Sequence, residues 1–224
     1  MINPLDKFLE MAQDRFASDS SDMTNGEWVI KNTTIRNRSF SFKGYEFQEQ
    51  IMNDMHPDMC CIKISQVGMT EVQIRKSLAF LLRNPGTSLI FSLPTEEMFK
   101  RLSGSRVKPI VNKDKVFNTL TDKENKAVRS VGLFQFGQSF LYLVPAIESA
   151  ATSIPADVVM NDEVDLSDQQ MMALFGSRMQ NSSHKINQKF STPSYPSYGI
   201  DAGQILASQD QYHKKDRMGS RTSD

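Results

Sequence analysis

A short apolar run near the first quarter of the chain is followed by a cation, a glycine and a hydroxyl residue. Residues 59–62 are apolar, and Lys63, Gly68 and Thr70 follow them before a helical pattern begins. Binding of an anionic phosphate calls for backbone N–H groups at a helix start, one cation for the terminal phosphates and one hydroxyl for Mg²⁺. Lys63, Gly68 and Thr70 can supply all three.

The spacing of these residues departs from the usual phosphate-loop template, glycine-x-x-x-x-glycine-lysine-serine/threonine. The second glycine falls on Gly68 and the hydroxyl on Thr70, but Lys63 stands at the first glycine and Met69 at the lysine. The lysine is therefore displaced rather than absent. A glycine-x-threonine after an apolar run also occurs in ordinary strand-to-helix turns, so the interpretation depends on partner residues elsewhere.

An acidic pair follows another apolar run later in the chain. Residues 158–161 lead directly into Asp162 and Glu163. A nucleotide hydrolase needs one acid for the Mg²⁺ shell and one to orient and deprotonate the attacking water. We assign these roles to Asp162 and Glu163, although acids at a helix entry also interact favourably with the helix dipole. Because both stretches lie where strands end and helices begin, we expect them on one carboxyl edge of a sheet.

The elements around these residues alternate between strands and helices. A helix over about 71–83 precedes a buried strand over 87–93, and a helix over 167–180 precedes a strand over 185–190. Gly137-Gln138, between two apolar runs, predicts a tight hairpin. The pattern predicts an α/β fold with a mostly parallel central sheet flanked by helices.

The ends of the chain differ from this alternating part. Residues 1–40 combine a predicted helix over 5–16 with a predicted strand over 27–31, and we expect a small N-terminal arm or lid there. A helix over 45–52 and another over 200–212 bound the main domain, which we place at residues 41–212. The polar, locally basic residues 213–224 are expected to form a linker.

Length, charge and cysteine content exclude several protein classes. The 224 residues suffice for one sizeable domain, and the 26 basic residues equal the 26 acidic ones, so no broad basic field indicates nucleic-acid binding by this chain alone. The adjacent Cys60 and Cys61 cannot form an ordinary disulfide with each other, which fits a reducing, intracellular compartment. The sequence shows neither a signal-peptide pattern nor a membrane-length apolar run, and we expect a soluble, cytosolic protein.

Taken together, these motifs resemble those of the large terminase subunits of tailed bacteriophages, the motors that package DNA into capsids. That family often has a deviant phosphate loop with an early lysine or arginine, as Lys63 is here, and its acidic motif matches residues 158–165. Its aromatic-x-x-glutamine element, which contacts adenine, matches residues 45–48, and its coupling motif matches residues 191–193. The likeness covers about residues 40–215.

The resemblance implies a RecA-like P-loop ATPase of the ASCE type that uses ATP and Mg²⁺. Lys63 and Glu163 are the implied catalytic residues, and Thr70 and Asp162 the implied metal-side residues. Ser191, Thr192 and Pro193 are implied to couple the γ-phosphate state to moving parts. The implied nucleotide-binding residues are Tyr45, Phe47, Gln48, Lys63, Ser65, Gln66, Val67, Gly68, Met69, Thr70 and Glu71.

Phosphoryl transfer also calls for an arginine, because negative charge builds on the transferred oxygens. No arginine occurs between Arg129 and Arg178, so the stretch leading into the acidic motif cannot supply one. This departs from what the family resemblance implies. The candidates that we retain are Arg75, Arg101, Arg106 and Arg178.

The resemblance further implies double-stranded DNA, a portal protein and a small terminase subunit as partners, with no membrane. It places the chain in the host cell cytoplasm, monomeric in isolation and assembled into a homo-oligomeric ring on the procapsid. In that family a nuclease domain follows the ATPase domain. This chain stops near where the nuclease would begin, so we expect an ATPase fragment or an ATPase-only relative that does not cleave DNA.

Two other functions remain open from the sequence. A helicase-like DNA-dependent ATPase would need a second motor domain, for which 224 residues leave no room. A nucleotide-binding interaction module without turnover is the other alternative. Glu163 argues against it, because pure binding needs no residue to activate water.

Overall fold

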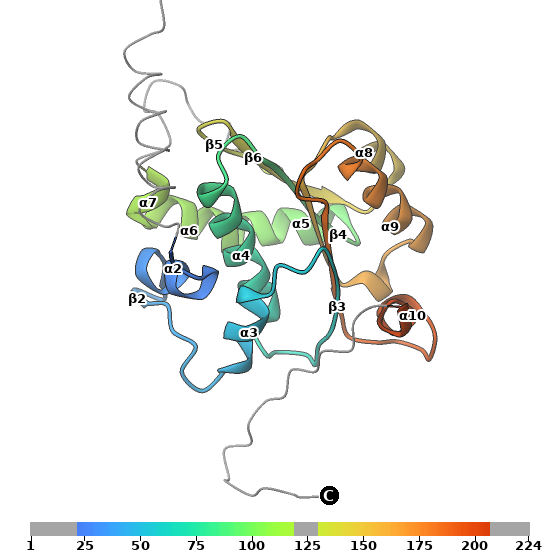
Figure 1. Ribbon diagram of the computed structural model, residues 1–224, viewed down its shortest axis with the longest axis horizontal. Coiled ribbons are helices and arrows are strands. Elements are labelled where there is room, and N and C mark those ends of the chain that lie inside the picture. Colours follow the sequence, from blue (N-terminus) through green and yellow to red (C-terminus); the bar gives the residue numbers. More distant parts are fainter. Residues whose placement is uncertain (1–21, 119–129, 207–224) are drawn as a thin grey trace, which may run out of the picture.

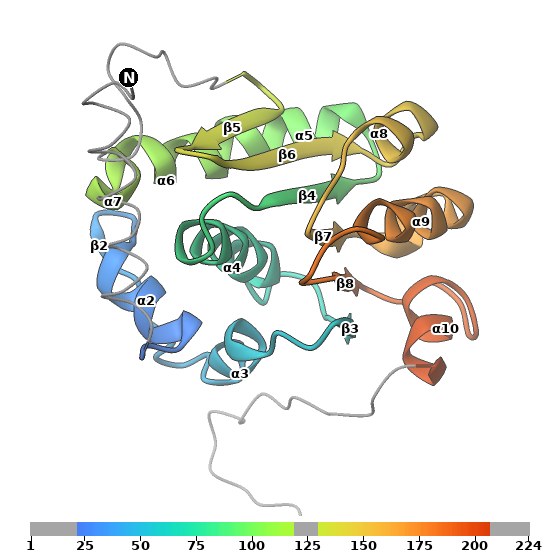
Figure 2. The same cartoon turned by 45° about the horizontal axis from the view of Figure 1, so that its top comes forward.

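A computed structural model describes residues 22–118 and 130–206 of the chain. Its centre is a six-stranded sheet in the order β3-β8-β7-β4-β6-β5, in which neighbours are parallel except for the antiparallel β5 and β6. Helices cover both faces (Figures 1 and 2). This confirms the predicted α/β fold. The strands are β3 (Asp58–Ile62), β4 (Ser88–Leu93), β5 (Leu133–Phe136), β6 (Ser139–Pro145), β7 (Val158–Asp162) and β8 (Ile186–Ser191).

Two groups of helices form the outer layers. On one face lie α2 (Asn25–Asn32), α3 (Phe47–Asn53), α4 (Met69–Arg83), α5 (Glu96–Leu102), α6 (Lys108–Lys113) and α7 (Lys115–Asn118), with the π-helix η1 (Ser103–Val107) between α5 and α6. On the other lie α8 (Glu148–Ser153), α9 (Gln169–Gly176) and α10 (Gly199–Leu206) (Figure 1). Short pieces complete the fold: the hairpin β1 (Thr34–Ile35) and β2 (Arg38–Ser39), and the 3-10 turns η2 (Val164–Leu166) and η3 (Ser177–Met179).

The central strands are buried on both faces. In β4, Leu89 and Phe91 belong to the larger core beneath α4, whereas Ile90 belongs to the smaller core beneath α9. In β7, Met160 faces the first core and Val159 the second. The sequences of such strands are continuous apolar runs, because the side chains on both faces of the sheet are shielded from water.

The predicted strand over residues 27–31 is wrong, because these residues lie in α2. The Thr24 hydroxyl accepts a hydrogen bond from the Glu27 N–H, and the Glu27 carboxylate accepts one from the Thr24 N–H at 2.7 Å. This reciprocal cap satisfies N–H groups that a helix start leaves free, and it outweighs the local β-branched residues. Trp28 of α2 is buried in the larger core, so the described part of residues 1–40 packs on the main body.

The other predicted elements agree with the structure to within a few residues. Gly137, with a φ of 58°, begins the turn of the β5–β6 hairpin as expected. The helix predicted over 167–180 is α9 followed by η3, and α10 corresponds to the described part of the helix predicted over 200–212. The predicted helix over 5–16 and the predicted linker lie outside the described residues. No helix within residues 22–118 and 130–206 is long and apolar enough to cross a membrane.

A buried lysine ties α3 to α4. Lys76 is 0% exposed, and its Nζ donates to the carbonyl of Ile51 at 2.8 Å and to that of Asp54. Burial lowers the pKa of Lys76 from its ordinary value to about 7, and the nearby charge of Asp54 opposes this only in part. The folded chain therefore releases this proton at a lower pH than the unfolded chain does.

Stability should depend on pH through Lys76. Above pH 7 and up to the ordinary pKa of lysine, the unfolded state binds more protons than the folded state, so the free energy of unfolding rises with pH. We expect the wild type to gain up to about 1.4 kcal/mol per pH unit relative to Lys76→Met, measured by urea denaturation across that window. The exposed Lys43→Met serves as a control with the wild-type slope. Equal slopes for wild type and Lys76→Met would contradict this prediction.

Candidate active site

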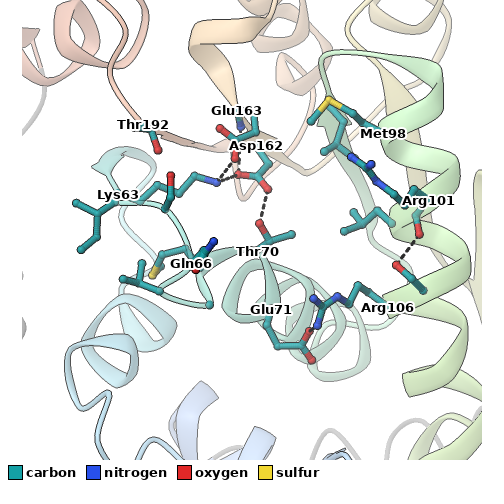
Figure 3. Close-up of a pocket in the computed structure, with 18 of the residues that line it drawn as sticks. Lys63, Gln66, Thr70, Glu71, Met98, Arg101, Arg106, Asp162, Glu163 and Thr192 are labelled. Atoms are coloured by element: carbon teal, nitrogen blue, oxygen red, sulfur yellow. Dashed lines mark hydrogen bonds and ion pairs between the residues drawn. The ribbon is translucent and has the colours of Figure 1, made fainter.

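Three adjacent strands end at one edge of the sheet, where a cavity of about 680 Å³ opens. β3 and β7 carry the two predicted motifs, and β8 lies between them. The residues after β3, at the end of β7 and after β8 therefore meet at the cavity (Figure 3). The carboxyl edge of a parallel sheet is where open α/β folds bind ligands.

The loop between β3 and α4 forms one wall of this cavity. Gly68 precedes α4 in the left-handed conformation, with a φ of 76°, and a Cβ there would lie 2.9 Å from Nε2 of Gln48. The left-handed conformation thus favours glycine, and any larger residue would also displace the Gln48 amide. The same Nε2 donates to the Val67 carbonyl at 2.6 Å, so α3 supports the loop from behind. The start of α4 opens onto the cavity and offers an N-terminus suited to an anion.

The displaced lysine lies against both predicted acids. Lys63 Nζ donates to Asp162 Oδ1 at 2.5 Å and to Glu163 Oε1 at 2.8 Å (Figure 3). Thr70 Oγ1 donates to Asp162 Oδ2 at 2.8 Å. The structure therefore brings together the cation, the hydroxyl and the two carboxylates that the sequence singled out.

The environment of Lys63 keeps it charged. Lys63 is 8% exposed and Asp162 only 2%. Burial lowers the pKa of Lys63, but the charges of Asp162 and Glu163 and their hydrogen bonds outweigh it, so the pKa lies above its ordinary value. An ammonium with oxygen partners on the cavity wall can exchange them for phosphate oxygens, because both are anionic acceptors.

Glu163 has an unusual backbone conformation. Its φ of 55° and ψ of 48° are left-handed, although it is not glycine. Its N–H donates to Asp162 Oδ1 at 3.1 Å, and the turn η2 follows at once. Non-glycine residues hold such a conformation where the surroundings enforce it, commonly at functional sites. Here it keeps the Glu163 side chain at the cavity, beside Lys63.

The donor set fits Mg²⁺. Thr70 and Asp162 present a hydroxyl and a carboxylate oxygen beside each other at the cavity. Mg²⁺ prefers oxygen ligands and is usually bound through one or two carboxylates, phosphates and several waters. In the described part of the chain no group of three or more His, Cys, Asp or Glu side chains is arranged to hold a metal. Phosphates and water are therefore needed to complete the coordination.

The predicted coupling segment is hydrogen-bonded to both motifs. The Ser191 carbonyl accepts from the Lys63 N–H at 2.9 Å, and Ser191 Oγ accepts from the Asp165 N–H at 3.0 Å. The Asp165 carboxylate in turn accepts from the N–H groups of Ser194 at 2.7 Å and Ile200 at 2.8 Å. Asp165 thus holds the segment after β8 and the start of α10, whereas the next helix, α9, is capped by Asp168.

Two of the four candidate arginines line the cavity. Arg101 of α5 and Arg106 of η1 stand on the wall opposite Lys63 (Figure 3). Arg106 NH1 lies 3.4 Å from Glu71 Oε2, and Arg106 is exposed. The cavity therefore has a cationic wall facing the acidic pair.

The structure does not bring the other two candidate arginines to the cavity. Arg75 is 1% exposed, and its guanidinium donates to Glu71 Oε1 at 2.7 Å and to the Thr34 carbonyl at 2.9 Å. Arg178 lies in η3, where its carbonyl accepts from the N–H of Ala156, just before β7 begins. This is the amino end of the strand, away from the cavity at its carboxyl end.

Most of the remaining predicted residues line the cavity, but not all. Among the predicted residues, those in the lining are Lys63, Ser65, Gln66, Val67, Gly68, Met69, Thr70, Glu71, Asp162, Glu163 and Thr192. Those outside the lining are Tyr45, Phe47, Gln48, Ser191 and Pro193. Phe47 packs against the larger core, and the Tyr45 and Phe47 ring centroids are 6.3 Å apart. Their contact with adenine stays a prediction.

Several residues at the site were not predicted. Arg36, in the β1–β2 turn, lines the cavity together with Ile64, Leu93, Met98, Leu102 and Ser105. Gln73 lies behind the cavity and donates to Asp162 Oδ1 at 3.0 Å. Gln73 stands three residues after Thr70, a spacing that places both on one helix face, so the sequence held a signal for it. The sequence held no such signal for Arg36, because the position of Arg36 depends on how the β1–β2 hairpin packs.

The comparison with solved structures shows the fold. The HK97 bacteriophage large terminase superposes with a TM-score of 0.64 at 16% identity, over 80% of this chain and 40% of that one. The UvsW helicase from bacteriophage T4 has a TM-score of 0.50 at 14% identity, over 75% of this chain and 58% of that one. The large terminase from the thermophilic bacteriophage D6E has a TM-score of 0.48 at 12% identity, over 72% and 42%. This chain therefore spans less than half of the HK97 terminase.

The fold is thus shared with the HK97 large terminase, and a family comparison is more specific. No curated protein sequence matches the chain. The model of the phage terminase large subunit gpA ATPase domain matches residues 43–216, which include both motifs and the coupling segment. The chain belongs to the family of phage terminase large subunit gpA ATPase domains.

Proposed function

We propose that this chain hydrolyses ATP with Mg²⁺ and that hydrolysis drives viral double-stranded DNA into a procapsid. The observation that carries the proposal is the contact of Lys63 with both Asp162 and Glu163 at the carboxyl edge of the sheet. The family supports ATPase activity. From the family we also propose a ring of copies on the procapsid, with a portal protein and a small terminase subunit as partners, in the host cytoplasm.

The proposed reaction begins when Lys63 exchanges the two carboxylates for oxygens of the terminal phosphates. Thr70 and Asp162 would hold Mg²⁺, which would supply positive charge to the phosphates and to the leaving group. Glu163, released by Lys63, orients a water molecule and accepts its proton as the water oxygen bonds to the γ-phosphorus. The bond between this phosphorus and the bridging oxygen breaks, and ADP leaves with that electron pair, beside inorganic phosphate. The backbone N–H groups of the loop that ends at Gly68, and those at the start of α4 as far as Glu71, hold the phosphates.

The cationic wall supplies the remaining charge. Arg101 and Arg106 lie opposite the acidic pair, and Arg36 adds a third cation at the same cavity. We assign stabilisation of the transferred phosphoryl group to Arg101 or Arg106. The contact between Arg106 and Glu71 favours Arg106, because the Arg106 side chain is exposed and its 3.4 Å contact is long, so it is easily exchanged.

The coupling role rests on hydrogen bonds. Ser191 contacts the backbone at Lys63 and at Asp165, so a displacement of either motif is passed to the segment that includes Thr192 and Pro193. We propose that Tyr45, Phe47 and Gln48 bind adenine. We further propose residues 41–212 as the ATPase domain, with an arm at 1–40 and a linker at 213–224.

Phosphate release from ATP tests this function. We expect the chain, at high protein concentration, to release phosphate with Mg²⁺ and to stop when EDTA removes it, because without the metal the Asp162 carboxylate adds negative charge beside the phosphates instead of holding a cation there. Tight ATP binding with no release under any condition would indicate a non-hydrolysing module. Hydrolysis accompanied by duplex unwinding would favour the helicase-like alternative, and failure to bind ATP would refute the nucleotide site altogether.

A further inference from the structure

A glutamine that no motif includes is hydrogen-bonded to the metal-side acid. Gln73 lies on α4, is 0% exposed, and donates through Nε2 to Asp162 Oδ1 at 3.0 Å. Its own Oε1 has no hydrogen-bond partner in the structure. A buried amide with an unsatisfied oxygen is unfavourable compared with an apolar side chain. Packing alone therefore does not explain a glutamine at this position.

The other groups that hold Asp162 have second tasks in the proposed reaction, on which this inference rests. Lys63 also donates to Asp162 Oδ1, and Thr70 donates to Oδ2. When Lys63 turns to the phosphates, its hydrogen bond to Asp162 Oδ1 is given up, whereas the Thr70 hydroxyl can bind the metal through its oxygen and still donate to Oδ2. The Glu163 N–H, at 3.1 Å from Oδ1, and the Gln73 amide remain.

We propose that Gln73 is a positioning residue for the metal site, holding Oδ1 of Asp162 so that Oδ2 stays directed at the cavity. A carboxylate rotates about its terminal torsion with little hindrance, so a donor on one oxygen determines where the other points. Partners of metal ligands act in this way, and their loss weakens metal binding even though they do not touch the metal. Gln73 reaches Asp162 from the protein interior, where no nucleotide competes for it.

The experiment measures metal binding rather than turnover. Mn²⁺ is titrated by electron paramagnetic resonance into the chain saturated with ADP, and ADP affinity is measured separately in EDTA. For Gln73→Met, which keeps the length but removes the amide, we expect Mn²⁺ affinity to fall about 10-fold or more, with ADP affinity in EDTA unchanged. Gln73→Asn keeps an amide but is one methylene shorter, and it should show the same loss.

The chain offers a matched control. Gln188 is also 0% exposed with an unpartnered Oε1, and its Nε2 donates to the carbonyls of Asp54 and His56, away from the cavity. Gln188→Met removes a buried amide in the same way as Gln73→Met but should keep wild-type Mn²⁺ affinity. If folded Gln73→Met and Gln73→Asn bound Mn²⁺ with wild-type affinity, the role proposed for Gln73 would be wrong, but the proposed function would stand. Absence of any ADP or Mn²⁺ binding by the wild type would instead overturn the proposed function and this inference with it.

Discussion

Glu163→Gln is expected to reduce ATP turnover by about 10²- to 10⁴-fold, the contribution typical of a general base, while ATP still binds. The amide cannot accept the proton of the attacking water. ATP affinity should equal or exceed that of the wild type, because Lys63 no longer has to give up an ion pair with Glu163 before it contacts the phosphates. Phosphate release under saturating Mg²⁺ and ATP gives the turnover, and a fluorescent nucleotide gives the affinity.

A matched acid on the surface controls for the change of charge. Glu97→Gln alters an exposed residue of α5 outside the cavity lining and should leave turnover and binding unchanged. If Glu163→Gln turned over as fast as the wild type, the water-activating role would have to move to another group. If it lost ATP binding as well, Glu163 would be part of the binding surface rather than the base.

Lys63→Ala is expected to abolish turnover and to weaken ATP binding about 10- to 100-fold, the worth of a hydrogen bond to a charged group. It should also destabilise the chain before any nucleotide is added. Asp162 is 2% exposed, and loss of its cation leaves a buried carboxylate uncompensated, which typically costs about 3–5 kcal/mol. Urea denaturation measures the stability, and nucleotide titration measures the binding.

A double variant separates the two effects of Lys63. In Lys63→Met with Asp162→Asn the buried charges are removed together, so stability should recover towards the wild type while turnover stays absent. Adding Met69→Lys, which puts a lysine at its ordinary position in the template, should not rescue Lys63→Ala, because Met69 is 3% exposed and packs in the larger core. Normal turnover by Lys63→Ala would remove the basis for assigning this stretch as the phosphate loop.

The residues around the two motifs were predictable to different degrees. Asp162 ends β7, Glu163 follows it and Thr70 lies in the first turn of α4, so the predicted strand ends and helix starts located these residues correctly. The prediction missed helix α2, because it followed the β-branched run and not the capping signal of Thr24 and Glu27, three residues apart, which outweighs that run in the structure. Arg75 and Arg178 are arginines, as the reaction needs, but they lie away from the cavity. The residue type alone does not say which way a side chain points.

The sequence by itself determined the fold class, the family likeness and the identity of the residues at the edge of the sheet, because strand ends, glycine turns and acidic pairs are local patterns. The tertiary structure alone decided how they meet. β8, the last strand among the described residues, lies between β3 and β7, which places Ser191 against the backbone of Lys63 and Asp165. Strand order, the inward reach of Gln73 and the approach of Arg36 depend on packing between distant segments, which no local pattern specifies.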